Sequence, residues 1–311
     1  MCKVVSYPLV YIIVLNYNGR RWLEACFDAL LATDYPNFRV TLVDNASNDG
    51  SVQMARDRYP QVEVIVNPAN DGFSEGNNVG IRAALANNAD YVVLLNPDTK
   101  VEPGWLQELI AAGETNARVG ILGAVQLEYA GAEFNSWTKA VMRQFLDELK
   151  RPESARDRIE VEWVEGSCFA VKRKVFEEIG LLDPIYFAFF EEIDFCRRAA
   201  SHGYTIAIVP RSRVRHYRGG SWEANPAIKR ERDYRCDRSQ FIYASTDPRI
   251  SFSRNLWRYF MTLGVKFKEA ARSLSLIRLC DLVRIQLDLL LTSVAIAGKW
   301  RRDRARLASV K

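Results

Sequence analysis

The stretch YVVLLNPDT, residues 91–99, carries the pattern that decides the fold. Its first five residues are apolar without alternation, which is typical of a strand buried on both faces of a parallel sheet. The same pattern recurs in YIIVLN (11–16), RVTLVDN (39–45) and VEVIVN (62–67). Apolar residues at helical spacing lie between these runs, in 20–33, 51–59 and 77–88. Strands that alternate with helices predict right-handed crossovers and therefore an α/β, doubly wound, mostly parallel sheet.

The regular alternation weakens after Gly120. The charged stretch DELKRPESARDR (147–158) predicts a mobile surface loop. VEWVEGSCFAVKR (161–173) predicts a strand, KVFEEIG (174–180) and FFEEIDFCRRAASHG (189–203) predict helices, and YTIAIVP (204–210) predicts another strand. The chain thus continues as a second α/β half after the first four strands.

The charge is distributed unevenly along the chain. The net charge is +5, but residues 249–311 hold 14 Lys and Arg against 4 Asp and Glu, a balance of +10, which leaves 5 − 10 = −5 for residues 1–248. We therefore predict a main domain over 1–248 and a basic, amphipathic helical extension over 249–311. Such a segment either lies on anionic lipid or packs against the main domain or a dimer partner. No recognition motif favours nucleic acid.

The cysteine and histidine content argues against several classes of protein. Six scattered cysteines without a C-x-x-C pair, and only two histidines, favour neither a zinc cluster nor a disulfide framework. The apolar run near the amino terminus ends in Asn16 without a cleavage signal, and no run reaches the length of a transmembrane helix. We therefore expect a cytoplasmic protein, in peripheral contact with the membrane if the extension binds lipid.

Polar side chains follow four of the predicted strands at the point where each strand ends. They are Asn16, Asp44 with Asn45, Asn67, and Asn96 with Asp98. Each alone could simply begin a turn or cap a helix. However, the carboxyl ends of parallel strands meet at one edge of the sheet, where open α/β sheets bind their ligands. Together these residues therefore predict a ligand-binding edge.

The chemistry of this edge favours a nucleotide bound with a metal ion. The loop NYNGRRW after the first strand holds neither a dinucleotide-binding glycine motif nor a phosphate-binding P-loop. Asp44 is placed as carboxylates are for ribose or base recognition, and Asp98 lies on a tight turn. Oxygen ligands without nearby cysteine suit Mg²⁺ or Mn²⁺, which commonly bind one or two carboxylates and substrate phosphates. We expect a nucleoside diphosphate.

A second acidic group stands in FFEEIDFCRRA (189–199). Acids in the first turn of a helix stabilise its dipole, and Asp194 could pair with Arg197 or Arg198. Glu191 and Glu192 follow an aromatic pair, so partial desolvation would make one of them basic enough to accept a proton. His216 lies in a basic loop, where a structural role competes with metal or phosphate binding.

Several phrases together resemble the family 2 glycosyltransferases, which are inverting enzymes of GT-A fold that use nucleotide-sugar donors. They are VLNYNG, VDNASNDGS, NDGFSEGNNVGI, LLNPDT, VEGSCFAVKRKVFEEIGLLD, FFEEIDFCRRAASHGY and VRHYRGGS, in family order over about residues 9–222. The resemblance implies a nucleotide-binding half over about 9–126 and an acceptor half over about 127–248. The LNPD variant resembles rhamnosyltransferases of bacterial surface-polysaccharide synthesis.

The resemblance assigns roles to individual residues. Asp44 corresponds to the acid that contacts the base or ribose, and Asp98 to the last acid of the D-x-D metal site. Asn96 stands where that motif usually has its first Asp, and His216 matches a histidine that completes the metal or diphosphate site. Asn70, Gly72 and Asn77 belong to the loop that closes under the donor, and Asn16 and Asn45 complete the nucleotide-sugar edge. Glu192 is the first choice for the catalytic base, and Glu191 is the reserve.

The implied reaction is the transfer of a sugar, with dTDP-rhamnose as the best candidate donor, to a hydroxyl of a glycan or lipid-linked acceptor. Glu192 removes the proton, and the cation, His216 and arginines such as Arg215 or Arg218 stabilise the leaving diphosphate. Three alternatives stay open: a UDP- or GDP-sugar donor, a sugar nucleotidyltransferase, and a non-catalytic sugar-binding module.

Overall fold

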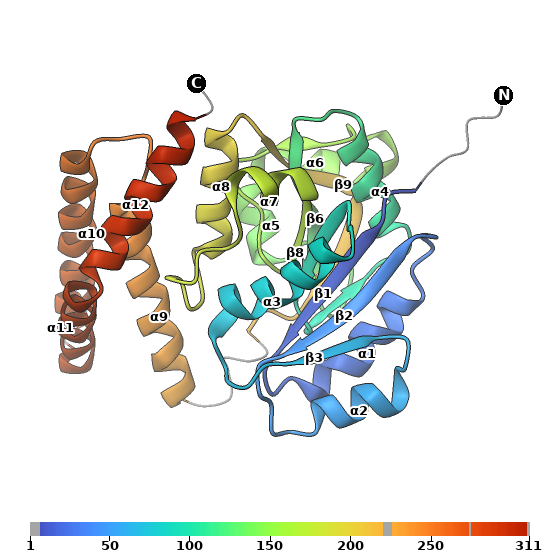
Figure 1. Ribbon diagram of the computed structural model, residues 1–311, viewed down its shortest axis with the longest axis horizontal. Helices are drawn as coiled ribbons and strands as arrows, with labels where there is room; N and C mark the ends of the chain where they lie inside the picture. The colour runs from blue at the N-terminus through green and yellow to red at the C-terminus, as the bar shows by residue number, and fades with distance from the viewer. Residues whose placement is uncertain (1–6, 220–225, 274, 310–311) are drawn as a thin grey trace.

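The structure is a computed structural model that describes residues 7–219, 226–273 and 275–309. A twisted sheet with helices on both faces forms the main body, and four helices, α9 to α12, stand together at one side of it (Figure 1). The sheet order is β3-β2-β1-β4-β8-β6-β9-β5, with β7 paired to β9. The predicted α/β fold is confirmed.

The strands follow the predicted runs closely in the first half. They are β1 (Val10–Asn16), β2 (Phe38–Asp44), β3 (Glu63–Val66), β4 (Tyr91–Leu95), β5 (Thr99–Val101), β6 (Val119–Glu128), β7 (Ile159–Glu160), β8 (Cys168–Lys172) and β9 (Thr205–His216). The first four are parallel to one another. Strand β8 runs antiparallel between β4 and β6, which joins the two halves of the chain in one sheet.

The helices of the main body cover both faces of this sheet. They are α1 (Arg20–Leu31), α2 (Ser51–Arg58), α3 (Gly72–Ala86), α4 (Trp105–Glu114), α5 (Ser136–Val141), α6 (Leu146–Leu149), α7 (Arg173–Ile179) and α8 (Glu191–Ser201). Alternate residues of β1 point to opposite faces: Ile12 packs with α1, α2 and α4, whereas Ile13 packs with α3, α7 and α8. Strands β1 and β4 and the last five residues of β2 are therefore buried on both faces, which explains their unbroken apolar runs. Strand β3 was expected to be buried as well, but it is half-buried or exposed because it lies at the edge of the sheet.

Several local expectations differ from the structure. His216, expected in a loop after the strand, is the last residue of β9, and the strand expected over 161–173 is limited to Cys168–Lys172. Helix α3 begins at Gly72, five residues before the predicted start at Asn77, because its first turn is polar and lacks the apolar period. The stretch 147–158 was expected to be a mobile loop, but it contains most of α6 and a short 3₁₀ helix over Pro152–Ser154. Buried Leu149 anchors this segment to the core.

The helical group at the side of the sheet begins before residue 249. It consists of α9 (Pro226–Ser245), α10 (Phe252–Arg272), α11 (Leu276–Leu291) and α12 (Ser293–Ala308). A third apolar core joins these helices to the segment before α8, through Tyr186 and Phe190. The division into 1–248 and 249–311 stays a prediction. Among the described residues, no helix is both long and apolar enough to span a bilayer.

Candidate active site

The carboxyl ends of β1 and β2 lie side by side, as the parallel register requires, with Asn16 opposite Asp44. The Asn16 side-chain amide donates to Asp44 Oδ2 at 2.7 Å, and the Ser47 backbone N–H donates to Asp44 Oδ1 at 2.7 Å. Both Asn16 and Asp44 are fully buried. Asp44 therefore links the loops that follow the two strands, and its contact with a nucleotide stays a prediction.

The loop expected to close under the donor is held against the same edge. The Asn45 side-chain amide donates to Asn70 Oδ1 at 3.2 Å and to the Gly72 carbonyl at 3.0 Å. Gly72 has a φ of 82°, and a Cβ there would lie 2.2 Å from the Phe187 carbonyl oxygen, so only glycine fits. Asn77 is buried and donates to the Phe73 carbonyl within its own helix at 2.9 Å.

The loop also reaches the second half of the chain. The Phe73 backbone N–H donates to the Phe187 carbonyl at 2.6 Å. A Cβ at Gly166 would lie 3.3 Å from the Phe73 ring and 3.9 Å from Glu192 Cβ. The donor loop, the turn before β8 and the first turn of α8 therefore meet at one place.

The predicted metal corner forms where β5 pairs with β9, because this pairing sets Thr99 opposite His216. His216 Nε2 lies 3.3 Å from Asp98 Oδ1 and 3.5 Å from the Asn96 side-chain nitrogen. The three residues, which the sequence separates by up to 120 positions, are thus neighbours. Gly220 and Ser221, the last residues of the VRHYRGGS phrase, lie outside the described part of the chain.

A chain of hydrogen bonds orients His216. The Thr138 backbone N–H donates to Asn135 Oδ1 at 2.9 Å, so the Asn135 amide nitrogen is the group that donates to Gln126 Oε1, also at 2.9 Å. His216 Nδ1 lies 3.1 Å from the same oxygen and must donate to it. In the neutral ring, Nε2 therefore presents its lone pair toward Asp98.

This arrangement suits a divalent cation. The Asp98 carboxylate and the imidazole lone pair, 3.3 Å apart, are two groups that could ligate one cation together. Two protein ligands with an adjacent amide leave positions for phosphate oxygens, as Mg²⁺ and Mn²⁺ require. Among the residues described, no group of three or more His, Cys, Asp or Glu side chains forms a complete metal site.

Glu165 belongs to this corner, although sequence reasoning did not select it. Its Oε1 accepts from Arg218 at 3.2 Å, and its Oε2 lies 3.8 Å from His216 Nδ1. Glu165 precedes β8, whose antiparallel insertion between β4 and β6 brings it to the site. The only sequence signal for Glu165 was that it is the single acid in the phrase VEGS. Arg215, the other candidate arginine, pairs with Glu102.

Glu191 and Glu192 open α8 behind a strained turn. Phe189 and Phe190 both have a left-handed backbone, with φ of 70° and 69°, which costs bulky residues about 1–3 kcal/mol each. In both glutamates Oε2 is buried without a hydrogen-bond partner. Burial, followed by the charge of Glu192, raises the pKa of Glu191 well above its usual range. Burial and then the charge of Glu165 raise the pKa of Glu192 to about 7.

Glu192 therefore meets the chemical requirement for a general base. A carboxyl group with a pKa near neutrality is partly ionised at physiological pH and is still basic enough to accept a proton. Glu192 Oε2 is the atom that would accept the proton, since it has no hydrogen-bond partner in the described structure. The backbone strain that places it is typical of functional turns.

Asp194 forms the ion pairs with Arg197 and Arg198 that the sequence suggested as its structural role. It is fully buried and accepts from Arg197 at 2.7 Å and from Arg198 at 2.9 Å. A third cation was not foreseen: Lys299 of α12 donates to Asp194 at 2.9 Å and to Asp303 at 2.6 Å. Burial alone would raise the pKa of Asp194, but the three cations outweigh it and hold that pKa well below its usual range.

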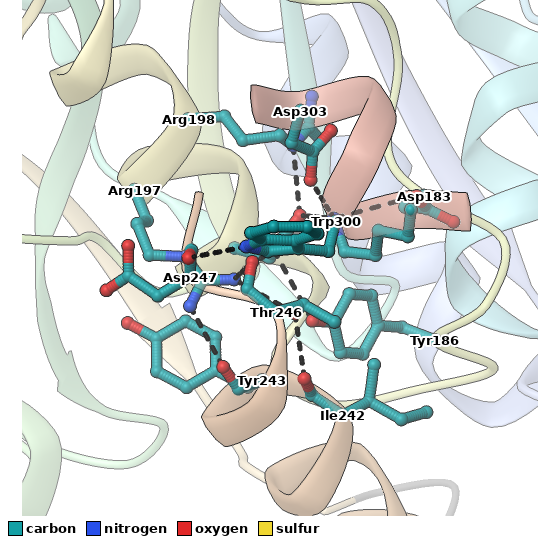
Figure 2. Close-up of polar contacts among 12 residues, drawn as sticks. Asp183, Tyr186, Arg197, Arg198, Ile242, Tyr243, Thr246, Asp247, Trp300 and Asp303 are labelled. Carbon is teal, nitrogen blue, oxygen red and sulfur yellow. Dashed lines mark hydrogen bonds and ion pairs between the residues drawn. The ribbon is translucent and has the colours of Figure 1, made fainter. Parts of the chain in front are cut away.

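Figure 2 shows how this cluster joins three helices. Arg197 of α8 donates to the Tyr243 carbonyl at the end of α9, at 2.9 Å. Trp300 of α12 donates through its indole N–H to the Asp247 carbonyl at 3.2 Å. The helix that carries Glu192 is therefore fixed to the C-terminal helices by buried polar contacts.

Solved structures place this architecture among the GT-A glycosyltransferases. A mannosyltransferase from Pyrobaculum calidifontis, solved with GDP-Man and Mn²⁺, superposes with a TM-score of 0.55 at 20% identity, covering 98% of this chain and 86% of its own. At this identity the likeness establishes the fold alone.

The sequence itself establishes the family. Residues 8–235 match the family described as "Glycosyltransferase like family 2", and the chain belongs to it. An N-acetylglucosaminyl-diphospho-decaprenol L-rhamnosyltransferase of Mycobacterium tuberculosis is 29% identical over 249 residues, which is 70% of this chain and 78% of the relative. A dTDP-rhamnosyl transferase of Shigella flexneri is 21% identical over 207 residues, 67% of this chain and 68% of the relative. The protein is a glycosyltransferase whose relatives include rhamnosyltransferases.

Proposed function

We propose that this glycosyltransferase moves rhamnose from dTDP-rhamnose to a hydroxyl of a lipid-linked saccharide, with inversion at the anomeric carbon. The names of the Mycobacterium and Shigella relatives support the sugar, the nucleotide and the lipid-linked acceptor. One observation carries the catalytic part of the proposal: Glu192 is half-buried, its Oε2 is out of contact with solvent and has no hydrogen-bond partner, and its pKa is raised beside the donor loop.

In the proposed reaction, Glu192 accepts the proton of the acceptor hydroxyl. The hydroxyl oxygen then forms the new bond to the anomeric carbon, while the bond from that carbon to the diphosphate oxygen breaks. The leaving group departs with the bonding electron pair as the nucleoside diphosphate trianion and needs no general acid. The buried surroundings of Glu192 assist this proton transfer, because they favour the protonated, neutral form of its carboxyl group.

Asp98 and His216, with Asn96 beside them, would hold a divalent cation. When bound, this cation would neutralise the charge that develops on the diphosphate. A histidine held by Gln126 in one tautomer needs no reorientation to offer Nε2, and this supports its role as a ligand. The rotation of the Asn96 amide would present its oxygen to the same position, since the two orientations of an amide are close in shape.

We further propose that the protein works in the cytoplasm against the inner face of the cell membrane, where a lipid-linked acceptor would be accessible. A UDP- or GDP-sugar donor is the competing possibility, supported by the GDP-Man in the Pyrobaculum structure. The family match favours sugar transfer over nucleotidyl transfer or sugar binding without catalysis.

The test combines donor binding with transfer. Thermal shift with Mn²⁺ and dTDP-rhamnose, UDP-sugars or GDP-sugars identifies the donor, because a ligand that binds the folded state raises its stability. Transfer to a polyprenyl-diphosphate N-acetylglucosamine acceptor is then measured with Glu192→Gln, Asp98→Asn and the exposed control Glu162→Gln. We expect the first two to lose at least 100-fold and the control to keep full activity. Full activity of both site variants would refute the mechanism, and stabilisation by another sugar nucleotide alone would refute the donor.

A further inference from the structure

The C-terminal helices expose an unusual amount of apolar surface. Among the described residues, 18 large apolar side chains are exposed, and 14 of these lie between Phe252 and Val294. They occupy α10, α11 and the start of α12, which stand at the side of the molecule away from the sheet (Figure 1). An apolar surface of this extent on a folded protein marks an interaction site.

The apolar residues of α10 form a stripe with a basic edge. Leu256, Phe260 and Phe267 are four and seven positions apart and therefore share one face, where they are 44–58% exposed. Trp257 lies beside them and is 63% exposed. The buried face of the helix packs on α9 and α11 instead. The side chains of this stripe therefore do not contribute to the packing of α10 on its neighbours.

The basic edge of this stripe follows the same helical spacing. Arg254, Lys268 and Arg272 are exposed and lie 14 and 4 positions apart, so they follow one line along α10. Arg278 is exposed at the beginning of α11. No ion pair involves these four side chains within the described part of the chain. The extension's acids point elsewhere: Asp281 pairs with Arg230, for example.

Helix α11 continues the apolar surface. Leu276, Val283, Leu287 and Leu291 are spaced seven, four and four positions apart, and they are 58–84% exposed. Val294, at the beginning of α12, extends this line and is 84% exposed. Because α10 and α11 pack against each other and against α9, their outer faces form one surface, which we call the α10–α11 face.

We propose that the α10–α11 face docks on an anionic lipid bilayer, with its apolar side chains in the interfacial region and its basic edge on the lipid headgroups. Aromatic and aliphatic side chains beside unpaired basic groups are the chemistry that such a surface selects. The proposal rests on the proposed function in one respect, because a lipid-linked acceptor requires the enzyme to work at a membrane.

The fold connects this face to the acceptor side of the site. Helix α9 lies beneath α10 and α11, and its Ser239 hydroxyl donates to the Ala188 carbonyl at 3.0 Å. The Arg235 guanidinium of α9 lies 4.2 Å from the centroid of the Phe187 ring. Residues 187 and 188 directly precede the strained turn that ends at Glu191. Docking through the α10–α11 face would therefore hold the base at a fixed distance from the lipid surface.

The experiment measures binding of the full chain to vesicles, without donor or acceptor. Sedimentation with phosphatidylglycerol vesicles is compared with phosphatidylcholine vesicles, and we expect at least tenfold stronger binding to the anionic lipid. Trp257→Ser with Phe260→Ser should weaken binding at least tenfold, as should Lys268→Gln with Arg272→Gln, since each basic group contributes roughly fivefold. The control pair Lys150→Gln with Lys174→Gln, exposed lysines of the main body, should bind as the wild type does.

Two further measurements separate the possible outcomes. Light scattering reports whether the face joins two copies of the chain, and a dimer that the Trp257 and Phe260 changes dissociate, without vesicle binding, would overturn the proposal. Equal binding by all variants would overturn it as well. Transfer to a short-chain, water-soluble acceptor should be unchanged in the face variants. If the wild type transfers no sugar but binds anionic vesicles, the proposed function fails and the docking face stands.

Discussion

Replacement of Lys299 by Met tests whether the C-terminal helices are fixed to the catalytic helix. Lys299 has no exposed surface, and its ammonium group lies 2.9 Å from Asp194 Oδ2 and 2.6 Å from Asp303 Oδ2. Methionine keeps an unbranched side chain that is one heavy atom shorter, and it removes the ammonium group with its charge and its hydrogen-bond donors. Two buried carboxylates then lose a partner, while Asp194 keeps Arg197 and Arg198.

The expected cost follows from this loss. Removal of one partner from a buried ion pair typically lowers the free energy of unfolding by about 3–5 kcal/mol. In a chain of this size, each kcal/mol corresponds to a decrease in Tm of about 1.5–2 °C, so the decrease should be roughly 5–10 °C. Thermal and urea unfolding, followed by circular dichroism, measure it.

The pH dependence identifies the cause. Lys299 helps to keep the pKa of Asp194 below its unfolded value, so this contribution to stability is present above the unfolded pKa and is lost as the pH falls. Without Lys299, Asp194 takes up a proton more readily. The difference in stability between the variant and the wild type should therefore stay constant from pH 8 to pH 5 and shrink only below about pH 4, the pKa of an aspartate in the unfolded chain.

Two companion variants decide the interpretation. Asp303→Asn in the Lys299→Met background should recover part of the loss, because it removes a carboxylate that has lost its partner. Arg301→Met, an exposed change on the same helix, should alter the stability by no more than about 0.5 kcal/mol. If Lys299→Met resembles Arg301→Met, the buried cluster does not hold the extension to α8.

Three other changes test the site. The kcat of the wild type should rise with pH through about 7 as Glu192 ionises, and Glu192→Gln should abolish this rise. The raised pKa means that the ionised carboxylate destabilises the folded state at pH 8, so Glu192→Gln should also increase Tm at that pH. Gly72→Ala should cost more than about 1 kcal/mol in unfolding experiments and weaken donor binding, since its Cβ would meet the Phe187 carbonyl. His216→Ala should raise the Mn²⁺ concentration needed for half-maximal donor binding by about tenfold or more, as measured by calorimetry, and Asp98→Asn should do so more strongly because it removes a charge.

The sequence could predict those parts of the fold that local patterns encode. Apolar runs identified β1, β2 and β4, because strands buried on both faces leave few positions for a polar residue, and a shorter run identified β3 although it lies at the edge of the sheet. The position of Asn16 and Asp44 at one edge followed from the parallel register alone. Asp194 was expected to pair one turn along its helix, and the i, i+3 and i, i+4 contacts with Arg197 and Arg198 are indeed formed.

The remaining features of the site depend on contacts between distant segments. Glu165 joins the site because β8 runs antiparallel between β4 and β6, and no local period encodes that choice of partner strands. Lys299 is 105 positions from Asp194, and an isolated lysine in a basic segment resembles any solvated one until the packing of α12 removes it from water. The pKa of Glu192 likewise depends on burial by distant residues.

The sequence by itself thus determined the alternation of strands and helices, the polar edge of the sheet and the family, because these depend on periodicity and on ordered local motifs. The tertiary structure alone decided the tautomer of His216, the strained turn before Glu191 and the anchoring of the C-terminal helices by Lys299. The physical reason is that burial, hydrogen-bond direction and charge pairing are properties of neighbours in space, which the order of residues along the chain does not specify.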